Sequence, residues 1–202
     1  MKTTTDDLLD VYREIVLPAF RAWIRTLGTE VRRGEVFPLL RARDHGADHT
    51  ARVSVLAVVL AAKTGSEDAV ENALLAGLFH DCGRKLEFGD PSHGERGAEA
   101  FERLAGPKLS RLEAGRRREI SDAVRVHSFD GTFPFASGTD EALLNADRLD
   151  LVRFGWKPDP SRLFGDAWKD LVEAAKGLAV ALPRERVLAD LGITADARGE
   201  CA

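Results

Sequence analysis

The residues of this chain that could do chemistry gather around one dipeptide, His80-Asp81, which ends an almost wholly apolar stretch that begins at Ala73. Such a stretch predicts a buried helix, and burying an unpaired charge costs several kcal/mol or more. A bound metal ion would offset that cost for the imidazole and the carboxylate together. The dipeptide therefore predicts that other histidines and aspartates of the chain complete a metal site.

Helical spacing places His49, His127 and Asp147 on apolar faces of three separate predicted helices, so all three should point into the core. Taken singly, an inward histidine is more often a hydrogen-bonded core residue, and an inward aspartate is usually a cap or an ion-pair partner. Their convergence with His80 and Asp81 favours a shared ion. Nitrogen and oxygen ligands in this mixture suit Mn, Fe, Co, Ni or Zn better than Ca or Mg.

Three further residues have simpler interpretations when each is taken alone. His45 lies one turn before His49, at or before the helix start, and His93 is typical of a surface residue at the start of a helix. Asp150, one turn after Asp147, is most simply an ion-pair partner for Arg153 or another basic group.

The elements that must position these residues are all helices. Apolar periodicity, with glycine, proline and serine between the periods, predicts helices over about 5–27, 46–64, 66–80, 93–104, 109–127, 139–154, 166–182 and 184–191. Pro18 should kink or split the first one, and Gly28 should end it. Three phenylalanines in 128–138 predict a loop that packs against another group, either a ligand or the core of the protein. No segment alternates as a strand does, so we expect an all-α, single-domain helical bundle of about seven to nine helices.

Composition narrows the class of protein further. The 202 residues suit one domain, 1–202, with the candidate site in 45–155, a helical extension in 1–44, and helices with a frayed tail in 156–202. A net charge of −4 argues against nucleic acid as a partner. Two cysteines, Cys82 and Cys201, make no disulfide framework. With neither a signal peptide nor a membrane span in the sequence, we expect a cytoplasmic protein.

Three short motifs resemble one known family. His49-Thr-Ala-Arg-Val53, His80-Asp81-Cys-Gly-Arg84 and Asn145-Ala-Asp147-Arg-Leu-Asp150 look like the H…HD…D signature of the HD-domain superfamily of metal-dependent phosphohydrolases. Their order and helical placement match over 45–155. The resemblance implies an all-α metal enzyme in which His49, His80, Asp81 and Asp147 hold a divalent ion.

The same resemblance raises the question of a second ion. Family members with two metals add histidines between the HD pair and the final aspartate, where this chain has His93 and His127. Asp81 would then bridge the two ions, and His45 would be an additional ligand or an outer-shell group. The interval from Asp81 to His93 is short compared with some two-metal members, so we expect one ion and leave the second open. The absence of a Tyr-Pro motif argues against the cyclic dinucleotide phosphodiesterases of the superfamily.

The activity that the resemblance implies is hydrolysis of a phosphoester or phosphoanhydride by metal-bound water. We expect a small phosphorylated substrate, by default a nucleotide, and Asp81 as the residue that ligates, orients the water and takes its proton. Arg84 is the best candidate for a catalytic cation that meets the phosphoryl oxygens. Lys85, Arg52 and Arg148 are further candidates for substrate binding, although Lys85 also fits a solvated loop and Arg52 an ion pair.

Rival functions share the same residues. The superfamily includes mixed-valent di-iron oxygenases with a similar ligand set, and a non-catalytic regulatory module with a structural ion would also use it. A single-strand nuclease is a further branch of the hydrolase reading, and a homodimer is compatible with the sequence.

Overall fold

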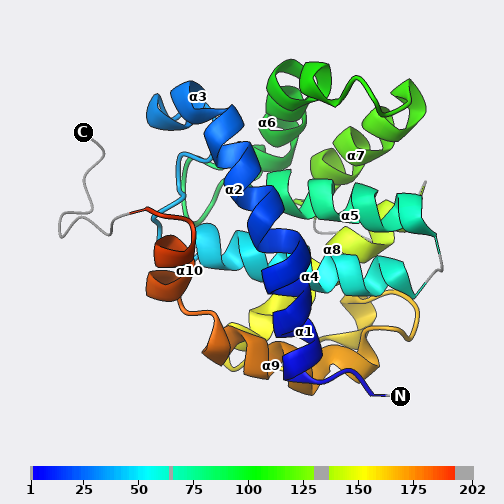
Figure 1. Cartoon of the computed structure of the whole chain (residues 1–202). Coiled ribbons are helices and arrows are strands. Elements are labelled where there is room, and N and C mark those ends of the chain that lie inside the picture. Colours follow the sequence, from blue (N-terminus) through cyan, green and yellow to red (C-terminus); the bar gives the residue numbers. More distant parts are fainter. Residues whose placement is uncertain (1, 64–65, 130–136, 194–202) are drawn as a thin grey trace.

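The computed structural model describes residues 2–63, 66–129 and 137–193, and within these ranges the regular structure is helical, with no strand. This confirms the all-α class (Figure 1). The α-helices are α1 (Thr5–Val11), α2 (Leu17–Thr26), α3 (Gly28–Arg32), α4 (Ala47–Ala62), α5 (Glu67–Phe79), α6 (His93–Ala100), α7 (Ala114–Val126), α8 (Gly138–Asp150), α9 (Val172–Ala181) and α10 (Arg184–Asp190). Single π-helical turns cover Tyr12–Val16 and Phe101–Ala105, and 3-10 turns cover Gly106–Leu109, Leu151–Phe154, Pro160–Arg162 and Lys169–Leu171.

The α4 helix forms the centre of the bundle. Its sequence is mostly alanine, valine and leucine, and all of its residues from Ala47 to Ala61 except Val59 are buried. It packs along α5 and α8, and α1 and α10 also contact it (Figure 1). The charged residues of α4 lie in its first two turns, so one end of a buried helix carries the polar chemistry.

The first predicted helix is interrupted as expected, but the interruption comes before Pro18. Proline has no amide hydrogen to donate to the carbonyl one turn earlier. The chain accommodates this with the π-helical turn at Tyr12–Val16, and Pro18 lies in the first turn of α2. The prediction that Gly28 ends the helix is wrong. The break lies at Leu27, whose backbone leaves the helical region (φ −104°, ψ 24°), and Gly28 begins α3.

Three other helix starts differ from the predictions. The helix expected from 109 begins at Ala114 and the one expected from 166 begins at Val172, each after a 3-10 turn. The α8 helix, expected from about 139, begins at Gly138 and is capped by Ser137. Ser137 Oγ accepts the amide hydrogen of Asp140 at 3.3 Å, and the Asp140 carboxylate accepts that of Ser137 at 3.2 Å. This reciprocal capping box makes Asp140 the third residue of the helix.

Some sequence predictions concern residues outside the described ranges, and others concern the exposure of a side chain or a possible membrane span. Phe133, Phe135 and Cys201 fall outside the described ranges, whereas Phe129 is described and more than half exposed. Among the described helices, none is both long enough and apolar enough to cross a membrane.

The crossing of α4 and α5 depends on a glycine, which yields a first prediction. A Cβ on Gly77 would lie 2.7 Å from the Cα of Ser54, and backbone at that distance cannot be avoided by a rotamer change. We expect Gly77→Ala to lower the free energy of unfolding by about 1–3 kcal/mol, measured by urea denaturation. The control is Gly115→Ala, because nothing lies within 4 Å of its new Cβ; it should be neutral or raise stability by up to about 1 kcal/mol. Equal effects of the two substitutions would contradict the close crossing.

Candidate metal centre

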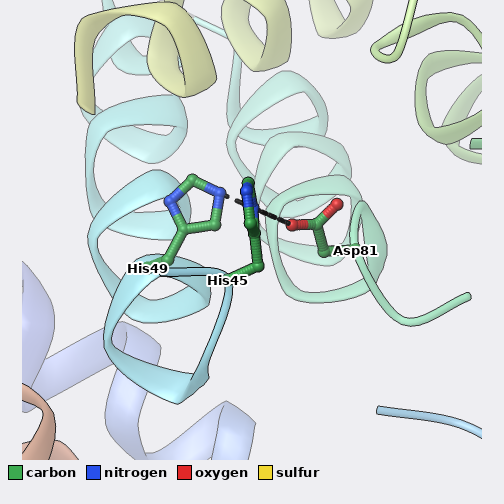
Figure 2. Close-up of side chains that lie close together, drawn as sticks. All are labelled: His45, His49 and Asp81. Atoms are coloured by element: carbon green, nitrogen blue, oxygen red, sulfur yellow. Dashed lines mark hydrogen bonds and ion pairs between the residues drawn. The ribbon is translucent and has the colours of Figure 1, made fainter. Parts of the chain in front are cut away.

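The candidate ligands come from the ends of five helices. His45 and His49 flank the start of α4, His80-Asp81 follows α5, His93 begins α6, His127 follows α7, and Asp147 lies in the last turn of α8. Figure 2 shows His45 and His49 facing Asp81. Residues that are far apart in the sequence thus meet where these helix ends come together.

One oxygen of Asp81 faces the first half of the cluster. His49 Nε2 lies 3.2 Å from His80 Nε2 and 3.3 Å from Asp147 Oδ1. Both imidazole nitrogens are 3.6 Å from Asp81 Oδ2. Of the four residues that the sequence predicted for one ion, the two imidazoles therefore lie together, with Asp147 and Asp81 both beside His49 Nε2.

The other oxygen of Asp81 faces the second half. His93 Nε2 and His127 Nε2 lie 3.0 Å apart, and they are 3.3 Å and 3.5 Å from Asp81 Oδ1. Asp81 thus stands between two pairs of imidazoles, with one carboxylate oxygen toward each pair. This is the placement that a bridging carboxylate needs.

Backbone carbonyls fix the orientation of three of the imidazoles. In each case Nδ1 bonds the carbonyl oxygen three residues earlier, at 2.7 Å for His80, 2.5 Å for His93 and 2.6 Å for His127. A carbonyl only accepts, so Nδ1 must carry the hydrogen, and each Nε2 presents its lone pair to the cluster. Ligating histidines in metalloproteins are held in this way.

His49 is held by a carboxylate in place of a carbonyl. Its Nδ1 lies 2.9 Å from Asp150 Oδ2, and Asp150 also accepts from Arg52 Nε at 2.8 Å and from Arg153 at 2.9 Å. Burial alone would raise the pKa of Asp150, but Arg52 and His49 hold it at about 2. Asp150 is therefore an ionised partner that directs the Nε2 lone pair of His49 toward the cluster. The expected ion pair between Asp150 and Arg153 is present, and it is part of the set of bonds that holds Asp150 against His49.

The proton positions make the cluster a fitting site for a cation. Nε2 of His49 faces Nε2 of His80, and Nε2 of His93 faces Nε2 of His127, so when the rings are neutral each pair at 3.0–3.2 Å has no hydrogen between its nitrogens. Burial lowers the pKa of His80 to about 3, and burial with the neighbouring His127 lowers that of His93 to about 4, so these two rings stay neutral near pH 7. Burial and Arg153 would lower the pKa of His49, but its hydrogen bonds to Asp147 and Asp150 raise it, so His49 can carry a second proton when no ion is bound. Burial would raise the pKa of Asp81, but its histidine neighbours, His80 foremost, hold it well below its usual range. A divalent ion would satisfy all of these acceptors.

Three residues define the accessible side of the cluster. Asp147 is the most exposed of the four predicted first-half ligands, with 29% of its side chain accessible. His45, 15% exposed, places Nδ1 3.1 Å from Asp81 Oδ2. Arg84 donates from Nε to Asp81 Oδ1 at 2.8 Å and from Nη2 to His93 Nε2 at 2.7 Å. Arg84 thus lies at the cluster, as the sequence analysis predicted, although its substrate role stays a prediction.

The remaining predicted substrate residues lie elsewhere. The Arg52 side chain is only 3% exposed and is bonded to Asp48, Asp150 and the carbonyl of Leu182, so we leave Arg52 out of the substrate contacts proposed below. The reason is physical: a buried guanidinium paired with two carboxylates has little freedom to meet a ligand.

Arg148 and Lys85 also stand apart from the ligands. Arg148 donates to the carbonyls of Arg162 and Phe129 and lines a pocket whose wall includes none of the candidate ligands. The Lys85 side chain is exposed, and among the described residues no hydrogen bond or ion pair joins it to the cluster.

Sequence reasoning missed how α6 reaches the cluster. A Cβ on Gly94 would lie 2.6 Å from the carbonyl oxygen of Arg125, so only glycine lets the start of α6 approach the end of α7 this closely. That approach brings His93 to His127. The glycine directly after His93 was the available signal, but one sequence does not say which helix it faces.

The bond from Asp150 to His49 yields a second prediction. Asp150→Asn replaces an ionised acceptor with a neutral amide, so we expect divalent-ion affinity to fall about 10–100-fold in isothermal titration calorimetry. The unfolding free energy should also fall, by about 3 kcal/mol, because buried Arg52 loses its charged partner. Asp159→Asn is the matched control, since Asp159 is exposed and its carboxylate bonds Ser161, which is none of the candidate ligands. A folded Asp150→Asn protein with wild-type metal affinity would show that the bond does not orient a ligand.

Comparison with known proteins identifies the family. The HD domain family model matches residues 46–153, just over half of the 202 residues. The match includes every residue of the two halves of the cluster and leaves out only His45. No curated protein and no solved structure matches the chain. The resemblance noted in the sequence is confirmed, and the chain belongs to the HD-domain family.

Proposed function

We propose that this protein is a divalent-metal-dependent phosphohydrolase that cleaves a phosphoester or phosphoanhydride in a small phosphorylated metabolite, by default a nucleotide. The observation that carries the proposal is the pairing of imidazole lone pairs around Asp81 with a guanidinium beside them. The first suits a bound cation, and the second supplies positive charge for an anionic substrate. Membership of the HD-domain family supports the same class of reaction.

The proposed roles follow from the geometry. His49, His80, Asp81 and Asp147 hold the ion of the first half, with His93 and His127 available for a second. A divalent ion bound there supplies a water of lowered pKa and polarises a phosphoryl oxygen. Asp81, ionised and central, accepts the proton of the attacking water. Arg84 donates to the phosphoryl oxygens from the edge of the site.

A small pocket near Asp147 supports a substrate with a ring. It has a volume of about 210 Å³ and begins at Leu151, one helical turn beyond Asp147. Its wall includes Trp156, 60% exposed, and its rim includes the cations Lys157 and Arg162. An exposed indole beside positive charge suits an aromatic base that carries phosphate.

The di-iron oxygenase reading has one observation in its favour, the placement of Asp81 between two pairs of histidines. It requires two irons and oxygen uptake. Metal analysis after anaerobic purification separates the two functions. Two irons per chain with oxygen uptake and no phosphatase activity would replace the hydrolase proposal.

A third prediction tests the proposal directly. After chelation and reloading with Mn, Co or Ni, the wild-type protein should hydrolyse at least one nucleoside mono-, di- or triphosphate. Asp81→Ala should lose bound metal and reduce turnover by more than roughly 100-fold, the upper limit for outer-shell changes, while the helical circular dichroism stays. Asp166→Ala, at a side chain that is 86% exposed, is the control and should behave as wild type. Hydrolysis by Asp81→Ala at the wild-type rate would refute the assignment.

A fourth prediction tests the ring-binding pocket. Trp156→Leu should raise KM for a nucleotide substrate by about 5–100-fold, since stacking on an aromatic side chain is worth about 1–3 kcal/mol. It should leave kcat/KM for a ring-free phosphate ester nearly unchanged. The second substrate is the internal control, because a general effect on the metal centre would lower both rates. Equal losses on both substrates would remove the pocket from the proposal.

A further inference from the structure

The two halves of the cluster differ in what already occupies their ligand atoms. In the second half, Arg84 Nε lies 2.8 Å from Asp81 Oδ1 and Arg84 Nη2 lies 2.7 Å from His93 Nε2. These are two of the three atoms that this half offers to an ion. In the first half, no lysine or arginine of the described chain bonds Nε2 of His49, Nε2 of His80 or the Asp147 carboxylate.

We propose that Arg84 and a second divalent ion compete for Asp81 Oδ1 and His93 Nε2, so that the two halves load in order and with unequal affinity. The first ion binds among His49, His80, Asp147 and Asp81 Oδ2. The second binds only in molecules whose Arg84 has turned away. This inference rests on the metal centre of the proposed function but not on its reaction.

The competition follows from counting lone pairs. A neutral imidazole with a protonated Nδ1 has one in-plane lone pair, at Nε2, and it cannot serve a guanidinium hydrogen and a metal ion together. Asp81 Oδ1 has more than one lone pair, but a guanidinium and a divalent ion on the same oxygen are like charges at contact distance. The second ion therefore displaces Arg84 instead of joining it.

Arg84 reaches the cluster from a loop. It follows α5, its side chain is 12% exposed, and it is the only lysine or arginine among the described residues bonded to either oxygen of Asp81. Once released, it remains three residues from Asp81, within reach of a ligand at the centre. Loading of the second ion is thereby linked to release of the side chain proposed to meet phosphate.

The test is the binding of Mn²⁺ alone, with no substrate, followed by isothermal titration calorimetry and by electron paramagnetic resonance. Wild type should bind one ion tightly and a second more weakly. Arg84→Met should tighten the second ion at least roughly tenfold, the gain expected if Arg84 engages the site in nine of ten molecules, and change the first by less than about threefold. It should also give the spectrum of a coupled ion pair at lower Mn²⁺ than wild type. Arg84→Lys, which keeps the charge, should leave the second ion weak.

Lys85→Met is the matched control. It removes the same positive charge from the next residue in the chain, and among the described residues the Lys85 side chain has no bond to the cluster. It should bind both ions as wild type does. Should Arg84→Met fail to fold, Arg84→Gln carries the same expectation. An unchanged or weaker second ion in Arg84→Met and Arg84→Gln, or equal affinities in wild type, would overturn the competition alone. A protein that binds no ion in any form would overturn the metal centre and the proposed function with it.

Discussion

Four imidazole nitrogens that turn their lone pairs toward one buried carboxylate form the constraint on which the rest of this structure depends. Nitrogen pairs at 3.0 Å and 3.2 Å around an ionised Asp81 repel one another unless a proton or a metal cation lies between them. Hydrogen bonds at Nδ1 nevertheless hold every ring in this orientation. Nε2 of His93 accepts a hydrogen bond from Arg84 Nη2 at 2.7 Å, and the other Nε2 atoms face one another and Asp81, an arrangement that suits a bound cation.

Helix ends explain how the chain orients these imidazoles at a low cost in free energy. The last carbonyls of a helix have no partner within it, and those of α5 and α7 accept Nδ1–H of His80 and His127. An unsatisfied backbone group thus becomes the clamp that sets a tautomer. The start of α4 lacks such carbonyls, and there Asp150 from the end of α8 performs the same task for His49. Packing α4 against α8 is therefore part of the site as well as part of the core.

Periodicity along the sequence predicted the helices and the inward faces of His49, His127 and Asp147, because the face of a residue is a local property. It did not predict that Arg52 pairs with Asp150, since the partner lies 98 residues away and spacing carries no information across helices. The early starts assigned to α7 and α9 fail for a related reason: 3-10 turns have similar composition to helix. The family resemblance recovered the order of the ligands, but only the structure separated their orienting partners from the substrate candidates.

The charges of the protein give the two halves of the centre different affinities for a cation, whichever metal ion binds. The first half meets Asp81 and Asp147 directly and has Asp150 behind His49, so several carboxylates favour a cation there. The second half shares Asp81, adds no carboxylate of its own, and faces the Arg84 guanidinium. A different metal would change both affinities together. It would not remove the difference between the halves, because that difference arises from the protein charges. Under the proposed competition, a single-ion and a two-ion form are two loadings of one centre, and the local ion concentration and the position of Arg84 decide between them.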